Sequence, residues 1–587
     1  MITSDDSCAS NNSQSQIGQP CRTDNIKAIA SYLRQGIKQA EQLGLELEHI
    51  LIHKESSAPV TYSEDCGIKA ILEKFSSSYP VRQTDIEDEL IGVSRNNAAV
   101  TLEPASQLEI SAGPFSSLKE LEDSIKSFED ELSSILTPWN EQALLTGYNP
   151  SAKADDLQLI PKRRYQFMDE HFKKIGPFGT CMMRASAATQ VSIDFNSEQD
   201  CINKMRLSCI LAPILSLITD NSPIFEGNPR LHQLVRTKIW NECDPVRCGS
   251  IPEIFNANYT FEDYARYILD TPAILFPCPE RGWCPTEKTF AELYSNKIMT
   301  EAEIEHAISM HFNDVRVKHY VEIRPADALP VPYALAYVAF IKGIFYQEEA
   351  ISSLLDSFSE INEADITQAK ADLMDYGYDA TVYGKPVSRI TRELLSFARK
   401  GLSKEEQLYL APISDLIRTQ ETLAQRIETQ NKLFKLGKDN SDTMVTVAYR
   451  GFFDDGAVFI DQRDPIDFPC CLGWMPPAFI ETVRSMKIGE TRITRVGANE
   501  AYEERTEERL IHVSREKLPE GIIQTPVGEL VNLEDPSGQT YPARVYEVTE
   551  TEIIFDMNHD AICKSLNFEI TLLRSIDLSQ ASGPRQL

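Results

Sequence analysis

The hydrophobic and polar positions divide the chain into two parts with different periodicity. Residues 1–23 are polar, and apolar positions at helical spacing begin after Asp24, a good helix N-cap. Short segments with strand-like alternation, separated by longer helical patterns, continue to about Arg324, and the stretch from Ile366 to Leu436 is almost purely helical. This mixture predicts an α+β domain over residues 24–436, preceded by a disordered tail.

The second part begins after a short polar segment, residues 437–443, which predicts a linker. Beyond it, short β-branched and aromatic runs alternate with turn signals such as Asp454-Asp-Gly456. This pattern predicts a β domain over residues 444–578, followed by a tail at residues 579–587.

Four strand-like segments of the first part share one design, with apolar side chains on one face and polar, mostly acidic, side chains on the other. Side chains at i and i+2 project from the same face of a strand. The polar positions are Glu46 and Glu48; Glu103, Gln107, Glu109 and Ser111; Gln190, Ser192 and Asp194; and Tyr320, Glu322 and Arg324. A solvated sheet face is the ordinary explanation for any one segment, but Glu and Asp are poor strand formers and recur in all four.

Carboxylates that line one concavity would repel one another unless cations lay between them. Mg²⁺ meets that need, because it takes hard oxygen ligands and bridges to nucleotide phosphates. The sequence has no GxxxxGK[ST] segment, so a nucleotide would be held by metal ions and basic side chains rather than by a P-loop. The basic candidates for phosphate or substrate carboxylate, each of which could equally be an ordinary surface residue, are Lys162, Arg164, Arg184, Arg236 and Arg247.

Charge and cysteine content narrow the class further. The 58 basic and 88 acidic residues give a net charge of −30, so neither nucleic acid nor an anionic membrane is expected as a partner. No apolar run reaches the length of a membrane span and the first residues do not form a signal peptide, which predicts a cytoplasmic protein. The 13 cysteines, Cys278 and Cys284 among them, lack zinc-site spacing, and reduced thiols are expected.

Taken in order, segments of the first part resemble the plant-type and bacterial glutamate–cysteine ligase family. They are Leu43 to His49, Thr101 to Pro114, Pro161-Lys-Arg-Arg-Tyr165, Thr189 to Phe195, Asn221 to Gly227, Arg236 to Gly249 and Val321 to Asp327. The resemblance covers about residues 24–435. It implies a glutamine-synthetase-like curved antiparallel sheet that forms a funnel, with ATP and Mg²⁺ as cofactors. It also implies transfer of the γ-carboxylate of L-glutamate to the amine of L-cysteine through γ-glutamyl phosphate, the first step of glutathione or related thiol synthesis.

The resemblance also assigns roles to residues by motif. Glu46, Glu48, Glu103, Glu109 and Glu322 would bind metal; Arg236 and Arg324 would be catalytic; and Lys162, Arg164, Gln190, Asp194 and Arg247 would bind the nucleotide or substrate. Two alternatives stay open. One is a ligase of the same fold with another amine acceptor, and the other is a decayed ligase that serves as a scaffold for the second part.

The second part carries aromatic residues that an ordinary β-domain core would also contain. The order of its segments over residues 443–578 nevertheless resembles an FKBP-type peptidyl-prolyl isomerase of the SlyD-like subgroup, with an inserted chaperone flap at about 504–562. The resemblance implies unfolded or proline-containing polypeptides as partners. It implies an apolar pocket for a proline ring, with Tyr449, Phe459 and Tyr502 catalytic and Met475, Pro476, Phe479 and Phe568 lining it.

Overall fold

The computed structural model describes residues 19–85, 88–278, 282–428, 443–470, 475–487, 489–497, 510–534, 540–556 and 564–577. These residues form two compact units that divide between Ile427 and Glu428. Each unit has its own hydrophobic core, as expected for a chain too long for a single core. The predicted tail at 579–587, and most of the predicted linker, lie outside the described residues.

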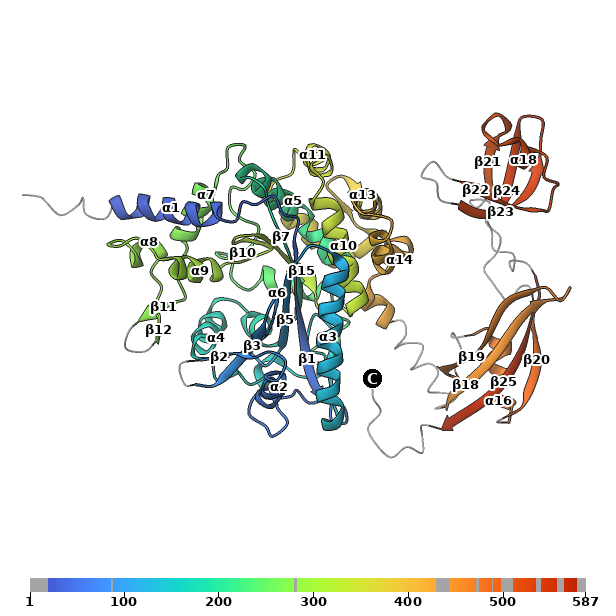
Figure 1. Cartoon of the computed structure of the whole chain (residues 1–587), viewed down its shortest axis with the longest axis horizontal. Helices are drawn as coiled ribbons and strands as arrows, with labels where there is room; N and C mark the ends of the chain where they lie inside the picture. The colour runs from blue at the N-terminus through green and yellow to red at the C-terminus, as the bar shows by residue number, and fades with distance from the viewer. Residues whose placement is uncertain are drawn as a thin grey trace, which may run out of the picture. The chain divides into compact units, whose positions relative to one another are not determined.

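A nine-stranded sheet forms the centre of the first unit (Figure 1). Its strands pair antiparallel in the order β14-β15-β7-β1-β5-β4-β3-β2, and β6 also pairs with β1. Their bounds are β1 (Leu43–His53), β2 (Val81–Thr84), β3 (Leu90–Arg95), β4 (Ala98–Leu102), β5 (Leu108–Phe115), β6 (Glu141–Leu144), β7 (Ala188–Ile193), β14 (Val315–Val317) and β15 (Val321–Asp327). The acidic segments singled out in the sequence contribute to four adjacent strands, β15, β7, β1 and β5. The segment from Thr101 to Ser111 is not one strand, because Glu103 and Gln107 lie in the turn between β4 and β5. The predicted α+β class is confirmed.

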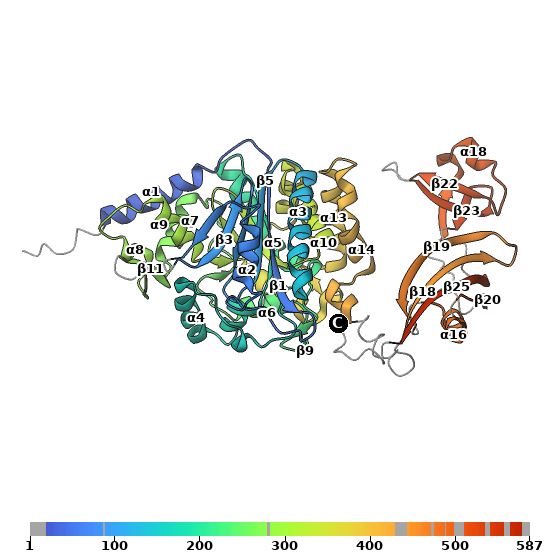
Figure 2. The ribbon, with the colours of Figure 1, turned by 60° about the horizontal axis from the view of Figure 1, so that its bottom comes forward.

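One face of this sheet is apolar and lies against helices. Leu45, Leu47, Ile110, Val191 and Ile193 are each at most 1% exposed. The helices α3 (Leu118–Leu136) and α10 (Val331–Phe345) contact β1 on this side, and Figures 1 and 2 show both helices beside that strand. Burial of the apolar face directs the alternate side chains of the same strands to the opposite face.

Helix α3 shows how the sequence sets the length and orientation of a covering helix. The Ser117 hydroxyl accepts a hydrogen bond from the Glu120 backbone N–H at 3.2 Å and caps the first turn. Buried residues then recur at helical spacing from Leu118 to Leu136 and form one apolar stripe. Helix α3 packs against β5, β6 and β1 of the sheet.

The remaining helices and short strands surround the sheet. The helices are α1 (Gln19–Arg34), α2 (Ile68–Phe75), α4 (Arg163–Ile175), α5 (Glu198–Ile218), α6 (Val235–Asn241), α7 (Phe261–Asp270), α8 (Phe290–Leu293), α9 (Glu301–Ser309), α11 (Glu348–Ser357), α12 (Glu363–Tyr376), α13 (Val387–Lys400) and α14 (Ala411–Thr419). The short strands are β8 (Ile224–Phe225), β9 (Asn228–Pro229), β10 (Cys248–Gly249), β11 (Leu275–Cys278), β12 (Gly282–Pro285), β13 (Phe312–Asn313), β16 (Thr381–Val382) and β17 (Lys385–Pro386).

Helix α1 begins before the residue that the sequence predicted. The tail was expected to extend to residue 23, but the helix starts at Gln19. Arg22 forms a salt bridge with Asp270 of α7 at 2.7 Å, which holds the first turn against the body of the unit.

Helix α5 is long and apolar enough to cross a membrane by length and composition alone. However, 89% of its most apolar window is buried inside the unit, as in the core helix of a globular protein. It contacts β15, and its apolar side chains belong to the main core.

Cys278 and Cys284 form a disulfide across the β11–β12 hairpin. The expectation of reduced thiols is therefore wrong for this pair. The expectation came from composition, whereas the pairing depends on a hairpin register that brings the two Cα atoms to 5.9 Å, within the range that a disulfide requires. Among the described cysteines, Cys243, Cys248 and Cys470 are examples of free thiols.

The second unit contains two separate four-stranded antiparallel sheets. The first has the order β19-β18-β25-β20 and is covered by helix α16 (Pro477–Ser485), whose Phe479, Ile480 and Val483 enter its core. Its strands are β18 (Thr443–Phe453), β19 (Val458–Pro469), β20 (Thr491–Val496) and β25 (Leu566–Asp577).

The second sheet is built from residues between β20 and β25. It has the order β21-β24-β23-β22 and packs a small core of its own, which includes Val545 and Phe555. Its strands are β21 (Leu510–Ser514), β22 (Leu530–Glu534), β23 (Thr540–Val548) and β24 (Glu552–Asp556), and the short helix α18 (Glu520–Ile523) lies between β21 and β22 in the sequence. This sheet falls within the segment that the sequence assigned to a flap.

Glu141, on β6, is a buried carboxyl away from the predicted site residues. It is 1% exposed, and within the described structure neither of its carboxyl oxygens has a hydrogen-bond partner. Burial raises its pKa to about 7; repulsion from Glu64 adds to the shift and attraction to His53 opposes it. The folded chain therefore keeps a proton on Glu141 at pH values where the unfolded chain has released it.

We expect Glu141→Gln to stabilise the protein only at the higher end of the pH range. Between the unfolded pKa of 4.5 and the folded pKa of about 7, the folded state binds more protons, so the wild-type free energy of unfolding falls as pH rises and is flat above that window. The variant should exceed wild type by about 1–3 kcal/mol at pH 8 and match it near pH 4.5. Urea denaturation at both pH values measures this, with the exposed Glu170→Gln on α4 as control. Equal shifts at both pH values would contradict the assignment.

Candidate functional site

The sheet register places the acidic side chains in cross-strand pairs on the face away from α3 and α10. Glu48 lies opposite Glu109, and Glu46 lies between Gln190 on one neighbouring strand and Ser111 on the other. Directly opposed side chains in a sheet have Cβ atoms about 5 Å apart, and opposed like charges destabilise the pair. The register therefore concentrates negative charge on the centre of the sheet.

Hydrogen bonds from the chain satisfy part of this acidic group. Glu48 accepts from the Ala188 N–H at 2.9 Å and from the Gln190 amide at 3.2 Å. Glu109 accepts from the hydroxyls of Thr101 at 2.8 Å and Ser111 at 3.0 Å. These donors are neutral, so they orient the carboxyl groups without cancelling their charge.

Four of the carboxyl groups on this face have raised pKa values, and burial is the largest cause in each case. Burial, followed by repulsion from Glu109 and Glu322, raises the pKa of Glu46 to about 8. Burial with repulsion from Glu103 and Glu109 raises the pKa of Glu48 well above its usual value. The pKa values of Glu103 and Glu109 are also raised, again mainly by burial. We call these four residues the acid cluster; a bound cation would favour their ionised forms.

Glu322 behaves differently from the acid cluster. Its carboxylate contacts the Arg316 Nε at 2.7 Å, the Arg324 Nη1 at 2.9 Å and the Lys318 Nζ at 3.4 Å. Burial alone would raise its pKa, but the three cations, Arg316 first, outweigh that effect and hold the pKa well below its usual value. Glu322 thus repels Glu46, but the chain supplies Glu322 itself with counter-charges. Its predicted role as a metal ligand stays a prediction.

Arg316 and Lys318 were not among the sequence candidates. Arg316 is on β14, directly opposite Glu322 in the register, and Lys318 follows the end of that strand. The alternation Val315-Arg-Val-Lys318 was a visible signal, with two apolar and two basic residues in strand register immediately before β15.

The residues fit Mg²⁺ in donor chemistry. Within the described residues, no three His, Cys, Asp or Glu side chains converge into a closed metal cage. Mg²⁺ does not need one, because it is usually held by one or two carboxylates together with water and substrate phosphates. Glu46, Glu48, Glu103 and Glu109 offer carboxylate oxygens, which are ligands of the kind that Mg²⁺ takes.

The predicted basic residues Lys162 and Arg164 reach the acid cluster from α4 and its N-cap. Burial lowers the pKa of Lys162, and attraction to Glu103 opposes part of that shift. Arg164 donates to the Ser309 hydroxyl at 2.8 Å and lies 5.8 Å from the centroid of the Trp283 ring. Within the described structure its buried Nε has no hydrogen-bond partner, which leaves one donor for an anion.

Arg236 and Arg324 lie together at the edge formed by β15. Arg236 donates to the Ala326 carbonyl at 2.7 Å, and both arginines line a small cavity. Arg324 donates to the Gln190 side chain as well as to Glu322. The structure thus connects two predicted catalytic arginines and the predicted ligand Gln190 to the acidic face.

Two other arginines are engaged elsewhere. Arg247 donates to Asp244 at 2.7 Å and to the Met310 carbonyl at 3.4 Å, and is 2% exposed. Arg184 forms a two-point contact with Asp169, at 2.7 and 2.6 Å. These buried pairs give both residues a structural role, and the nucleotide-binding role of Arg247 stays a prediction.

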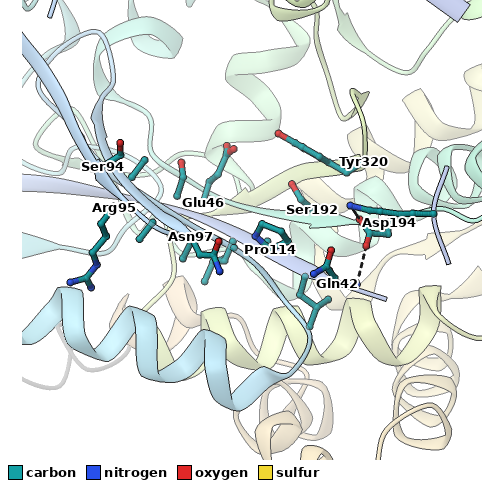
Figure 3. A pocket seen from close by; sticks show the side chains of 18 of the residues that line it. Gln42, Glu46, Ser94, Arg95, Asn97, Pro114, Ser192, Asp194 and Tyr320 are labelled. Atoms are coloured by element: carbon teal, nitrogen blue, oxygen red, sulfur yellow. Dashed lines mark hydrogen bonds and ion pairs between the residues drawn. The ribbon is translucent and has the colours of Figure 1, made fainter. Parts of the chain in front are cut away.

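A cavity of about 530 Å³ opens beside Glu46 at one end of the acidic face (Figure 3). Its wall includes small side chains such as Ser111 and Ser192, together with Tyr320 and Asp194. Asp194 accepts from the Gln42 backbone N–H at 3.0 Å and pairs with Lys38 at 2.8 Å. Asp194 thus lines this cavity together with Glu46, and its predicted binding role stays a prediction.

The second unit brings four of its predicted residues into an aromatic cage, defined as Tyr449, Phe459, Phe479 and Phe568. The ring centroid of Phe568 lies 6.1 Å from that of Tyr449, 5.7 Å from that of Phe459 and 5.3 Å from that of Phe479. Met475 packs against the same cluster. Tyr502 lies outside the described residues, so its predicted role is untested.

The fold and the two sites define a fusion of a carboxylate–amine ligase domain with a prolyl isomerase domain. Residues 42–437 match the family model described as glutamate–cysteine ligase family 2 (GCS2), and the chain belongs to this family. Residues 437–573 match the model of the FKBP-type peptidyl-prolyl cis-trans isomerases, which identifies the second unit.

The curated relatives include chloroplastic glutamate–cysteine ligases of plants. That of Brassica juncea is 27% identical over 68% of this chain and 79% of its own length. Glutamate–cysteine ligase B of Oryza sativa subsp. japonica is 27% identical over 70% of this chain and 84% of its own length. Among solved structures, a glutamate–cysteine ligase of Francisella tularensis in complex with AMP has 12% identity and a TM-score of 0.43, covering 69% of this chain and 86% of that one.

We expect Glu46→Gln and Glu322→Gln to change stability in opposite directions. Removing the Glu46 charge relieves repulsion, so the urea midpoint without Mg²⁺ at pH 8 should hold or rise. Removing the Glu322 charge leaves three cations uncompensated and should cost about 3–5 kcal/mol. Parallel urea titrations of both variants and wild type test this contrast, and a stabilised Glu322→Gln would contradict the ion-pair assignment.

Proposed function

We propose that the first unit ligates the γ-carboxylate of L-glutamate to the amine of L-cysteine, using ATP and Mg²⁺. The observation that carries the proposal is the division of one sheet face into an acid cluster without enough counter-charge and a cation-rich edge around Glu322. A metal–nucleotide complex has complementary charges, because the metal is positive and the phosphates are negative. Membership of the glutamate–cysteine ligase family supports the choice of substrates.

The chemistry requires that a poor leaving group be converted into a good one. A γ-carboxylate oxygen of glutamate attacks the γ-phosphorus of ATP; the new P–O bond forms as the bond to the bridging oxygen breaks, and ADP leaves with that electron pair. The cysteine amine then attacks the acyl carbon of γ-glutamyl phosphate. The C–O bond to phosphate breaks, phosphate departs, and the nitrogen loses its proton to the released phosphate.

The chain's own residues orient and stabilise these reactants. Glu46, Glu48, Glu103 and Glu109 would hold Mg²⁺, which when bound neutralises phosphate oxygens. Glu322 is the fifth predicted ligand. It is less available to a metal ion than the other four, because it already pairs with three cations. Lys162, Arg164, Arg236 and Arg324 would contact phosphate or the substrate carboxylate, because they are buried cations beside the acidic face.

The second unit is proposed to isomerise X–Pro bonds in polypeptides. An apolar cage removes water from the peptide bond, which favours the twisted amide and lowers a barrier of about 18–20 kcal/mol. The separate sheet of β21 to β24 would act as a tether that raises the local concentration of an unfolded chain near the cage. Of the two alternatives, a decayed ligase is disfavoured because four of the five predicted metal-binding carboxylates lie on strands of one sheet and the fifth, Glu103, directly follows β4.

We expect purified protein to release phosphate from ATP only with Mg²⁺, L-glutamate and an amine acceptor, with L-cysteine the best acceptor. A coupled phosphate assay across a panel of amines measures this. Glu46→Gln should lower the rate by about 100-fold or more, because a metal ligand loses its charge. Equal rates with several unrelated amines would favour the same-fold ligase with another acceptor, and an absence of glutamate-dependent release would favour the scaffold.

We expect the two activities to be separable by single substitutions. Phe459→Ala opens the aromatic cage and should lower isomerisation of a proline peptide by about tenfold while ligase activity stays within twofold of wild type. Glu46→Gln should show the reverse pattern and serves as the matched control. A protease-coupled peptide assay and the phosphate assay on the same preparations provide the comparison; joint loss in either variant would argue against separate sites.

A further inference from the structure

The edge strand β14 brings two basic side chains into the buried polar group of the first unit. Arg316 and Lys318 both contact Glu322, which is 0% exposed, and Arg324 contacts it from β15. One carboxylate therefore faces three cations. Buried charges are normally paired, so two positive charges in excess of the carboxylate call for an anion.

Among the described residues, the acid cluster forms no ion pair with Arg316 or Lys318. Glu46 lies on β1 and Glu109 on β5, and β7 lies between these strands and β15. The ion pairs of Arg316 and Lys318 are with Glu322. The contact geometry therefore leaves one carboxylate with an excess of cations.

Arg316 and Lys318 differ in how closely they contact their partners and in how exposed they are. Arg316 is a close partner of Glu322 at 2.7 Å, also donates to the His311 carbonyl at 3.3 Å, and its side chain is 10% exposed. The Lys318 Nζ lies at 3.4 Å from Glu322 and 3.3 Å from the Tyr320 hydroxyl, and its side chain is 28% exposed. Lys318 therefore has donors to spare and room to turn, whereas Arg316 is fixed.

Lys318 also lies beside the cavity next to Glu46. Tyr320, whose hydroxyl accepts from Lys318, lines this cavity of about 530 Å³ together with Glu46 (Figure 3). Lys318 thus contacts a side chain that forms part of the cavity wall.

We propose that Lys318 is a catalytic residue of the first unit, which donates hydrogen bonds to the phosphoryl group that passes from ATP to glutamate. The inference rests on the proposed function and adds a residue to it. Lys318 remains protonated throughout: the P–O bond to glutamate forms, the bond to ADP breaks, and the ammonium stabilises the charge on the non-bridging oxygens without giving up a proton. Arg316 is a positioning residue that holds Glu322 in place.

The test compares Lys318→Met and Lys318→Arg with wild type and with Lys342→Met. Lys342, on α10, is a matched control, because it is also a partly buried lysine in an ion pair, with Glu406 at 2.5 Å. Calorimetry with Mg²⁺ measures the affinity for ADP and for the β,γ-imido analogue of ATP, and the phosphate assay measures kcat. The two nucleotides differ by the phosphoryl group that Lys318 is proposed to contact.

We expect Lys318→Met to bind ADP within threefold of wild type, to lose about tenfold of the preference for the imido analogue over ADP, and to lose about 100-fold in kcat. Lys318→Arg should recover a large part of the preference, and Lys342→Met should match wild type. Equal losses for both nucleotides, or a wild-type preference in Lys318→Met, would overturn the proposal. If circular dichroism shows that Lys318→Met is unfolded, Lys318→Gln is judged by the same criteria. A wild-type enzyme without ligase activity would refute the proposed function, and the nucleotide preference would still decide the role of Lys318.

Discussion

Burial of one apolar sheet face against α3 and α10 is the constraint on which the first unit depends. Because side chains alternate along a strand, fixing Leu45 and Leu47 inward fixes Glu46 and Glu48 on the other side. A slip of one residue in β1 would place carboxylates in the core and leucines in the site. The stability of the hydrophobic core and the geometry of the acidic face are thus set by the same register.

The acidic face could be predicted from the sequence because it follows from the alternation of residues within short segments. Alternation within the segments around Glu46, Glu109, Gln190 and Glu322 was enough to assign their orientation, and the structure places them on four adjacent strands. Residues whose roles depend on distant partners were less predictable. Arg247 was predicted to bind the nucleotide, and its contacts with Asp244 and the Met310 carbonyl depend on the fold. The three cations that contact Glu322 also depend on the pairing of β14 with β15 and on local packing.

The same distinction explains the other differences. The disulfide between Cys278 and Cys284 depends on hairpin register, and Arg22 in the first part of α1 pairs with the distant Asp270. Neither is encoded in composition or short-range periodicity. In the second unit the order of the segments was enough to bring Tyr449, Phe459, Phe479 and Phe568 together, because core aromatics in a small β fold have few places to go.

The direct pairing of β20 with β25 has a consequence for how the second unit can change. Val496 pairs with Leu566, so the chain leaves the main sheet and re-enters it at neighbouring positions, although a whole four-stranded sheet lies between them in sequence. An intervening segment with its own core and closely spaced ends behaves as a cassette. It can be lengthened, replaced or lost during evolution while the register of the host sheet is preserved, so substrate range and cage chemistry are free to diverge at different rates.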